Sequence, residues 1–246
     1  MSDRPVETIV CLGSSTTASR GTYKWIDELQ KRPQNSRFRF ANFGVGGDLS
    51  FNTIAALDRV IALRPQRVII LIGANDVMAS VFPNFWRFVR VVKRVSEEPS
   101  PARFQENLDF IVHRLQREAN AKIGLSSLGP LGEDPKSDHP VQARLNDLIA
   151  TYNGVIRDVA SMRRTDYIPF SELFEEQLLH AGTAKPFTHF SFASFYRDYL
   201  FREMVLRQSF DRIAHINGWQ FHVDGIHLNT EGGRILTEAV QQFLDS

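Results

Sequence analysis

The sequence predicts an α/β fold built on a parallel sheet, and three observations carry this prediction. Short β-rich runs alternate with helical patterns, at residues 7–13, 38–44, 67–73, 121–127 and 166–170. This alternation is typical of parallel strands joined by crossover helices. The third run is continuously apolar from Val68 to Ile72, as expected for a central strand that is covered on both faces. The segments between the runs carry apolar residues at helical spacing.

Three connecting segments show this spacing most clearly, and each predicts one helix with a buried face. The first has its apolar positions at Phe104, Leu108, Ile111, Val112 and Leu115. The second has them at Leu145, Leu148, Ile149, Tyr152, Ile156 and Val159. The last segment, which closes the fold, predicts a helix that Asn229 or Thr230 can cap. Its inward-facing residues are Ile235, Leu236, Ala239, Val240 and Phe243.

Two insertions interrupt the alternation, at residues 81–100 and 174–220. In the first, Phe82, Phe85, Val89 and Val92 share a helical face, with Arg87, Arg90, Lys93 and Arg94 among the others. We expect this helix to pack beside the candidate site rather than on a membrane. The second is too long for a plain loop, so it should contain helices. Its aromatic residues between Phe187 and Phe201 are expected to pack in the core rather than line a pocket. Residues 1–246 are interpreted as one domain.

Composition excludes several classes of protein. The 246 residues have 29 Lys and Arg against 28 Asp and Glu, so the formal charge is +1 and no overall field attracts nucleic acid or an anionic membrane. The lone cysteine, Cys11, lies in an apolar run and is interpreted as a buried hydrophobic residue. No apolar stretch is long enough to span a membrane. The N-terminus lacks the apolar core of a signal peptide, which predicts a cytoplasmic protein.

Polar turns follow the first three predicted strands, at residues 13–17, 44–48 and 73–76. Each alone is an ordinary turn or helix cap. In open α/β sheets, however, ligands bind beyond the carboxyl ends of the strands, where successive crossovers go to opposite faces. The three turns therefore bring hydroxyl groups, backbone N–H groups and the Asn75 amide to one edge of the sheet. These groups are of the kind that supply a nucleophile and the donors for an oxyanion.

A serine nucleophile needs a base, and Asp224 with His227 supplies one. The pair lies in a turn just before the last helix, which can return to the same edge of the sheet. A carboxylate three residues from the imidazole can reach Nδ1 and leave Nε2 for the serine. Among the seven histidines, the rival is His222, because His222, Asp224 and His227 can also be interpreted as metal ligands. Their spacing matches no recognised metal site, and we expect no metal.

These motifs together resemble those of the SGNH hydrolases, also called GDSL-type esterases and lipases. The family has four blocks that contribute a serine, a glycine, an asparagine and a histidine, in that order. Gly13-Ser14-Ser15-Thr16-Thr17 matches the first block with Ser15 at the nucleophile position, and Gly47 matches the second. Asn75 in Gly73-Ala74-Asn75-Asp76 matches the third, and Asp224 with His227 the fourth. One departure is Ser14, which stands where the family usually has aspartate.

The resemblance implies a three-layer, flavodoxin-like α/β/α fold with a five-stranded parallel sheet of order 2-1-3-4-5 and helical insertions. It also implies hydrolysis of a small-molecule ester through an acyl-enzyme, without a cofactor. Ser15 would be the nucleophile, His227 the base and Asp224 its orienting partner. The backbone N–H groups of Ser15 and Gly47 and the amide of Asn75 would form the oxyanion hole. The adjacent Ser14 leaves the register of the nucleophile open, although the family pattern favours Ser15.

Two alternatives remain at this point. A flavin- or nucleotide-binding module of the same topology could use the hydroxyl-rich turn of residues 14–19 to hold a phosphate, but this leaves Asn75, Asp224 and His227 unexplained. A catalytically inactive relative that acts as a binding protein is the other. The acyl and alcohol groups of the substrate, and the oligomeric state, are not readable from the sequence.

Overall fold

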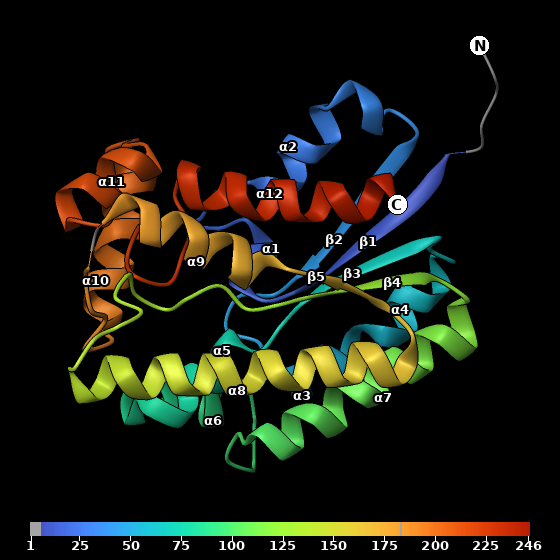
Figure 1. Cartoon of the computed structure of the whole chain (residues 1–246), viewed down its shortest axis with the longest axis horizontal. Helices are drawn as coiled ribbons and strands as arrows, with labels where there is room; N and C mark the ends of the chain where they lie inside the picture. Colours follow the sequence, from blue (N-terminus) through green and yellow to red (C-terminus); the bar gives the residue numbers. More distant parts are fainter. Residues whose placement is uncertain (1–5, 183) are drawn as a thin grey trace.

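The computed structural model of the chain describes residues 6–182 and 184–246. Its centre is a five-stranded, all-parallel sheet of order β2-β1-β3-β4-β5, which confirms the predicted fold (Figure 1). The strands are β1 (Glu7–Gly13), β2 (Phe38–Gly44), β3 (Arg67–Leu71), β4 (Lys122–Ser126) and β5 (Asp166–Ile168). The last three are shorter than the sequence runs. At the end of the fifth run, Phe170 already begins the next helix.

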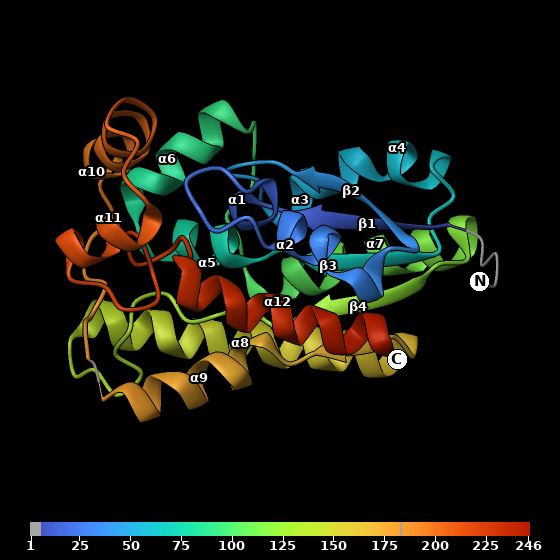
Figure 2. The same cartoon turned by 90° about the horizontal axis from the view of Figure 1, so that it is seen from above.

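Helices cover both faces of this sheet, as Figures 1 and 2 show. One layer contains α2 (Trp25–Lys31), α9 (Phe170–Ala181) and α12 (Thr230–Asp245), and the other contains α4 (Leu57–Ala62), α7 (Pro101–Ala119) and α8 (Pro140–Arg163). Parallel strands need right-handed crossovers, so the reversal of chain direction after β2 sends the later connections to the opposite face. The remaining elements are α1 (Ser15–Ala18), α3 (Ser50–Thr53), α5 (Ala74–Val81), α6 (Pro83–Val92), α10 (Phe192–Tyr196), α11 (Phe210–Asn217), two 3₁₀ turns (Pro33–Asn35, Ile54–Ala56) and a π-helix (Arg197–Val205).

The core lies against the two central strands. Ile9, Val10, Val68 and Ile69 are at most 1% exposed, which confirms the third run as a strand covered on both faces. Cys11 in β1 is fully buried, and this burial raises the pKa of its thiol far above its ordinary value. Within the described residues, no helix is both long and apolar enough to cross a lipid bilayer.

The predicted helical faces are also confirmed. All five apolar positions of α7 are buried, and in α8 only Leu148 is partly exposed. At the start of α12, the side chain of Asn229 accepts a hydrogen bond from Gly232 N at 3.1 Å, so Asn229 rather than Thr230 is the cap.

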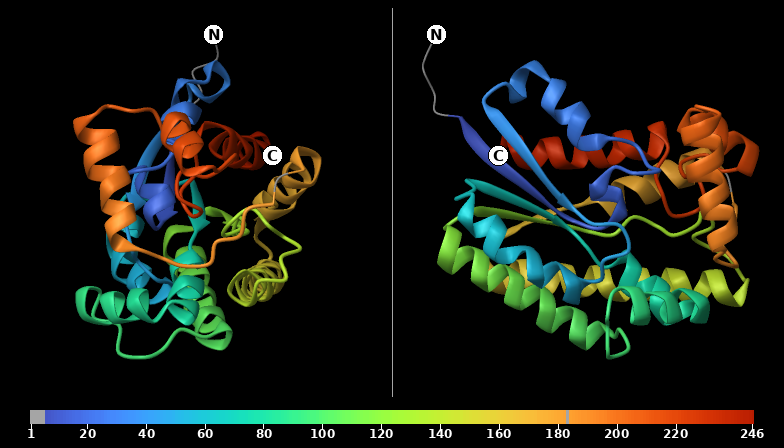
Figure 3. Two further views of the ribbon diagram at one scale, coloured as in Figure 1. Left: turned by 90° about the vertical axis from the view of Figure 1, so that its left-hand side faces the viewer. Right: turned by 180° about the vertical axis from the view of Figure 1, so that it is seen from behind.

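Strand register places the candidate turns together. Gly13 at the end of β1 lies opposite Gly44 of β2 on one side and Leu71 of β3 on the other. The turns that follow these strands therefore leave the sheet at the same edge. The α10, π and α11 helices stand at this end of the molecule (Figure 3).

Candidate active site

Ser15 and His227 meet at the carboxyl edge of the sheet. The Oγ atom of Ser15 lies 3.0 Å from Nε2 of His227, although 212 residues separate them in sequence. Ser15 is the first residue of α1, whose terminal carbonyls are held from two sides. Trp25 Nε1 donates to Thr16 O at 3.0 Å, and Asn42 Nδ2 donates to Thr17 O at 2.7 Å. Ser14, by contrast, is buried with 5% of its surface exposed.

A carboxylate orients the imidazole. Asp224 Oδ2 accepts from Nδ1 of His227 at 2.8 Å, and Oδ1 accepts from the backbone N–H groups of Ile226 at 3.0 Å and His227 at 2.8 Å. This tight turn depends on Gly225, whose φ of +90° suits glycine. The structure thus brings the three predicted residues Ser15, His227 and Asp224 into one hydrogen-bonded chain.

Electrostatics within the pair favour charge separation. Burial opposes ionisation of Asp224, but the charge and hydrogen bonds of His227 outweigh it, so the pKa of the carboxyl lies below its ordinary value. Burial also lowers the pKa of His227, yet Asp224 and, to a smaller extent, Glu203 raise it above 6.5. An imidazole in this setting is a stronger base than one in water.

Two of the three predicted oxyanion donors, Gly47 and Asn75, come from the neighbouring turns. Asn75 Nδ2 donates to the carbonyl oxygen of Asp48 at 2.8 Å, which ties the start of α5 to the residue after Gly47. The adjacent Asp76 accepts from Ser50 Oγ at 2.7 Å and from Ser50 N at 3.0 Å. Gly47 itself has φ of +76°, a conformation that glycine adopts without strain.

A small cavity of about 30 Å³ adjoins the candidate nucleophile. Ser15 and Asn75 both line it, and Gly129, Pro130 and Leu131 belong to the same lining. Gly47, although described, is not among its lining residues. The structure therefore brings Ser15 and Asn75 to one cavity, and connects Gly47 to it through Asp48 and Asn75.

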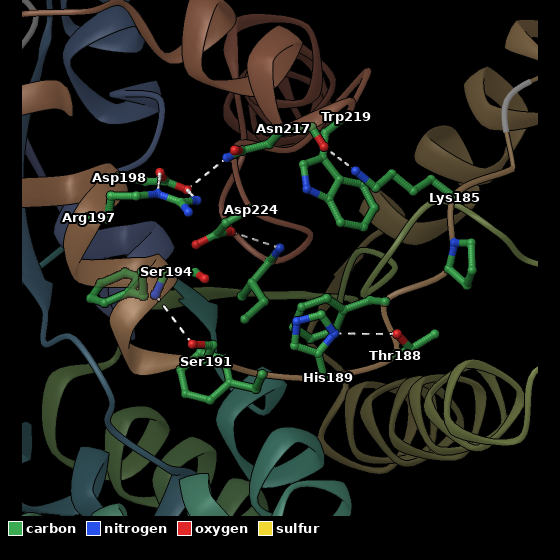
Figure 4. A pocket seen from close by; sticks show the side chains of 15 residues that line it. Lys185, Thr188, His189, Ser191, Ser194, Arg197, Asp198, Asn217, Trp219 and Asp224 are labelled. Carbon is green, nitrogen blue, oxygen red and sulfur yellow. Dashed lines mark hydrogen bonds and ion pairs between the residues drawn. The ribbon is translucent and has the colours of Figure 1, made fainter.

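A larger cavity of about 340 Å³ reaches Asp224 from the insertion 174–220. Figure 4 shows its polar lining, in which Asp198 is tied to Arg197 and Asn217. Ile226 lines both cavities. The walls also include the aromatic residues Phe187, Phe190, Phe195 and Trp219.

The expectation that the aromatic residues of this insertion pack in the core holds only in part. Phe187 is buried but also lines the larger cavity, as do Phe190 and Phe195, and Phe201 is 54% exposed. The ring of Phe195 also lies 5.3 Å from that of His227. Aromatic clusters form around a cavity as readily as within a core, so their spacing did not distinguish the two.

The first insertion lies beside the site, as expected. Phe85 and Phe88 of α6 contact Phe192 of α10. Val92 does not share the buried face, because it ends the helix and is 57% exposed. Sequence reasoning missed the contribution of Lys93, whose Nζ lies 2.8 Å from Asp48 Oδ1, next to Gly47.

His222 takes no part in a metal cluster. Its Nδ1 lies 3.0 Å from Oε1 of Glu133, and its Nε2 lies 3.2 Å from the carbonyl oxygen of Pro130. Among the residues that the structure describes, no group of three or more His, Cys, Asp or Glu side chains is arranged to hold a metal ion. Glu133 was also missed, since a single glutamate after a predicted strand carries no sequence signal.

The chain resembles known proteins both in sequence and in structure. The model of the GDSL-like lipase/acylhydrolase family matches residues 11–235. No curated protein sequence matches the chain. Solved structures that resemble it include the acetyl xylan esterase AlAXEase, with 18% identity, a TM-score of 0.65, and coverage of 96% of this chain and 99% of that one.

Two further structures resemble the chain. LAE5, an α/β hydrolase from the metagenome of Lake Arreo in Spain, has 19% identity, a TM-score of 0.63, and coverage of 97% of this chain and 94% of that one. Axe2, an acetylxylan esterase from Geobacillus stearothermophilus, has 16% identity, a TM-score of 0.61, and coverage of 98% and 95%. At such identities the likeness establishes the fold.

Proposed function

Because the chain belongs to the GDSL-like lipase/acylhydrolase family, we propose that it hydrolyses carboxylic esters with Ser15 as nucleophile, His227 as base and Asp224 as its orienting partner. The observation that carries this proposal is the hydrogen-bonded chain from Ser15 through His227 to Asp224, at 3.0 Å and 2.8 Å. The same geometry favours Ser15 over the buried Ser14. Family membership by itself supports only the coarser statement that the protein is an ester hydrolase.

The proposed reaction has two halves. His227 Nε2 takes the proton of Ser15 Oγ as this oxygen bonds to the ester carbonyl carbon, and the imidazolium then gives that proton to the departing alcohol. In the second half, His227 takes a proton from water, which attacks the acyl-enzyme. The tetrahedral intermediate that results then collapses, which releases the carboxylic acid and returns the proton to Ser15. Asp224 keeps Nε2 free throughout by holding the proton of Nδ1.

The oxyanion would bind to the N–H groups of Ser15 and Gly47 and to the Asn75 amide. Asn75 is suited to this role because its Nδ2 carries two hydrogens, of which one is held by Asp48 O. The other remains for the oxyanion, while the hydrogen bond to Asp48 fixes the orientation of the amide. Such fixed donors stabilise developing charge without the cost of reorganising solvent.

The cavities favour a short acyl group and a larger alcohol. The space beside Ser15, about 30 Å³, is small and favours a short acyl group such as acetyl. The larger cavity, about 340 Å³, has room for the alcohol group. Two of the structural neighbours are described as acetyl xylan esterases, which agrees with an acetyl ester as substrate.

The test compares three proteins on p-nitrophenyl acetate. Ser15→Ala should lose nearly all turnover, whereas Ser14→Ala should lose much less. Labelling by a fluorophosphonate should occur in the wild type and in Ser14→Ala, and be absent in Ser15→Ala. Turnover at the wild-type rate by folded Ser15→Ala would refute the assignment.

A further inference from the structure

A second buried acid–histidine pair lies beside the first. Glu133 and His222 are 1% and 0% exposed. Glu133 Oε1 accepts from the backbone N–H groups of Phe221 at 2.7 Å and His222 at 2.9 Å, and from Nδ1 of His222 at 3.0 Å. Its Oε2 accepts from Gln220 N at 2.9 Å. The proposed reaction does not use either side chain.

Both ring nitrogens of His222 face oxygen atoms. Nδ1 of His222 faces a carboxylate and Nε2 faces a carbonyl oxygen, and both oxygens can only accept hydrogen bonds. Burial opposes ionisation of Glu133, but His222 and the backbone donors outweigh it, so the pKa of this carboxyl is lowered. Glu133 therefore binds both the backbone of the segment 220–222 and the ring of His222.

The pair joins the two walls of the candidate site. On one side, Pro130 accepts from His222, and Gly129, Pro130 and Leu131 line the small cavity beside Ser15. On the other side, His222 directly precedes the segment that carries Asp224 and His227. Two backbone contacts continue the connection: Gly132 N donates to Gly225 O at 2.8 Å, and Val223 N donates to His227 O at 2.6 Å.

We infer that Glu133 and His222 are positioning residues for the hydrolysis, which fix the ring of His227 relative to Ser15 and set the width of the acyl cavity. This inference rests on the proposed function. Neither residue touches the reacting atoms. They act through Pro130 and through the turn at Gly225, and a displacement of about 1 Å in such a site can reduce the rate 100-fold.

Two variants test this role. His222→Phe keeps an aromatic ring next to Phe174, whose centroid lies 5.2 Å from that of His222, but removes both donors. Glu133→Gln keeps an acceptor for the backbone N–H groups and removes the charge. The matched control is Asn35→Ala, which breaks the buried amide pair of Asn35 with Gln241 at the α2–α12 contact.

Each protein is titrated with a fluorophosphonate to count active sites. The kcat per active site and the KM are then measured on p-nitrophenyl acetate and p-nitrophenyl butyrate. The assay temperature lies below the midpoint of thermal unfolding of each protein. In both test variants we expect kcat per site to fall about tenfold or more. We also expect the substrate ratio, which is kcat/KM on the butyrate divided by kcat/KM on the acetate, to rise. Asn35→Ala should lower only the thermal midpoint. If the test variants keep the kcat per site and the substrate ratio of the wild type, the inference is overturned.

Two outcomes need separate readouts. If both variants fail to fold, Glu133→Asp, which keeps the charge but shortens the reach of the carboxylate to His222, is measured in the same way: a fall in kcat per site supports the inference, and wild-type kcat per site and substrate ratio overturn it. If the wild type neither reacts with the fluorophosphonate nor hydrolyses acetate, the proposed function itself fails. That result is distinct from wild-type behaviour of the variants.

Discussion

Lys93 donates to Asp48 across the candidate site, with Nζ and Oδ1 2.8 Å apart and both side chains less than a fifth exposed. The Lys93 stem also packs on Gly47, because a Cβ atom added to that glycine would lie 3.1 Å from Cε of Lys93. The insertion 81–100 therefore holds the turn that carries Gly47, one of the proposed oxyanion donors. Asn75 holds the same turn from the other side, through the Asp48 carbonyl.

Breaking this ion pair should loosen the turn. Lys93→Met and Asp48→Asn are each expected to lower kcat by roughly tenfold with little change in KM, since the turn contributes mainly to the transition state. A double-mutant cycle should show a coupling of about 1 kcal/mol in activation free energy, because the two residues act as one unit. Arg94→Met, which alters an exposed neighbour, is the control. Strict additivity of the two changes would contradict the role.

The pH dependence of turnover should reveal the charges around His227. The base must be neutral, so kcat/KM should fall as pH drops through its pKa, which lies above 6.5. Glu203 contributes to raising this pKa, hence Glu203→Gln should shift the acidic limb to lower pH. Glu231→Gln, an exposed change in α12, should leave the limb in place. A limb that stays fixed or moves upward in Glu203→Gln would argue against this electrostatic account.

Removing the Asn75 amide should cost about 10² to 10³ in kcat, the range for one oxyanion donor. KM should change little, because the donor acts on the charge that develops in the transition state. Steady-state kinetics on p-nitrophenyl acetate check this. A loss of less than tenfold in a folded Asn75→Ala protein would remove Asn75 from the oxyanion hole, and Asn35→Ala serves as the buried-asparagine control.

Asp76 should make stability depend on pH. Burial raises the pKa of this carboxyl from 3.8 to about 6, against the hydrogen bonds from Ser50. Between these values the folded state keeps a proton that the unfolded state releases, so the free energy of unfolding falls as pH rises from 4 to 6. The loss amounts to about 3 kcal/mol and is complete above pH 6.

Asp76→Asn should abolish this fall in the free energy of unfolding between pH 4 and 6. Urea unfolding at several pH values, compared between wild type and variant, measures the difference directly. The pKa of Asp109 is lowered by its hydrogen bond and charge interaction with Arg163, so Asp109→Asn should leave the slope between pH 4 and 6 unchanged. Equal slopes in wild type and Asp76→Asn would contradict the assignment.

Two glycines, one at the end of β2 and one in the turn after it, should respond differently to alanine. A Cβ at Gly44 would lie 2.1 Å from the backbone nitrogen of Ala18, so Gly44→Ala must displace α1 and with it Ser15. We expect a destabilisation of about 1 to 3 kcal/mol and a large loss of kcat. A Cβ at Gly46 meets nothing within 4 Å, so Gly46→Ala should keep wild-type stability. Thermal unfolding with kinetics compares the two, and equal effects would refute the packing argument.

The sequence was sufficient for the fold because its signals are local. The continuous apolar run of β3 marks a central strand, and the polar turns at the ends of β1, β2 and β3 mark the functional edge of the sheet. The approach of Ser15 to His227 was also expected, since the motifs containing them sit at that edge. The ends of the strands were predicted less accurately. Ile72 and Gly73 belong to the predicted third strand, but they already lie in the turn before α5.

Isolated polar residues in the site were not predictable. Lys93 finds its partner 45 residues away, and Glu133 finds His222 at a separation of 89 residues. Neither pair has a period or motif, so only the packing of the insertions brings them together. The placement of Phe195 against His227 was also missed, because a cluster of aromatic residues fits a core or a cavity equally well.

The contact between Ser15 and His227 spans 212 residues, so it can form only after the whole intervening segment has been synthesised. During synthesis the serine leaves the ribosome first, and the imidazole follows 212 residues later. A nascent chain that has not yet reached His227 consequently lacks the proposed base for its serine. Reactivity toward a serine-directed probe would thus report when His227 has been synthesised and has folded against Ser15.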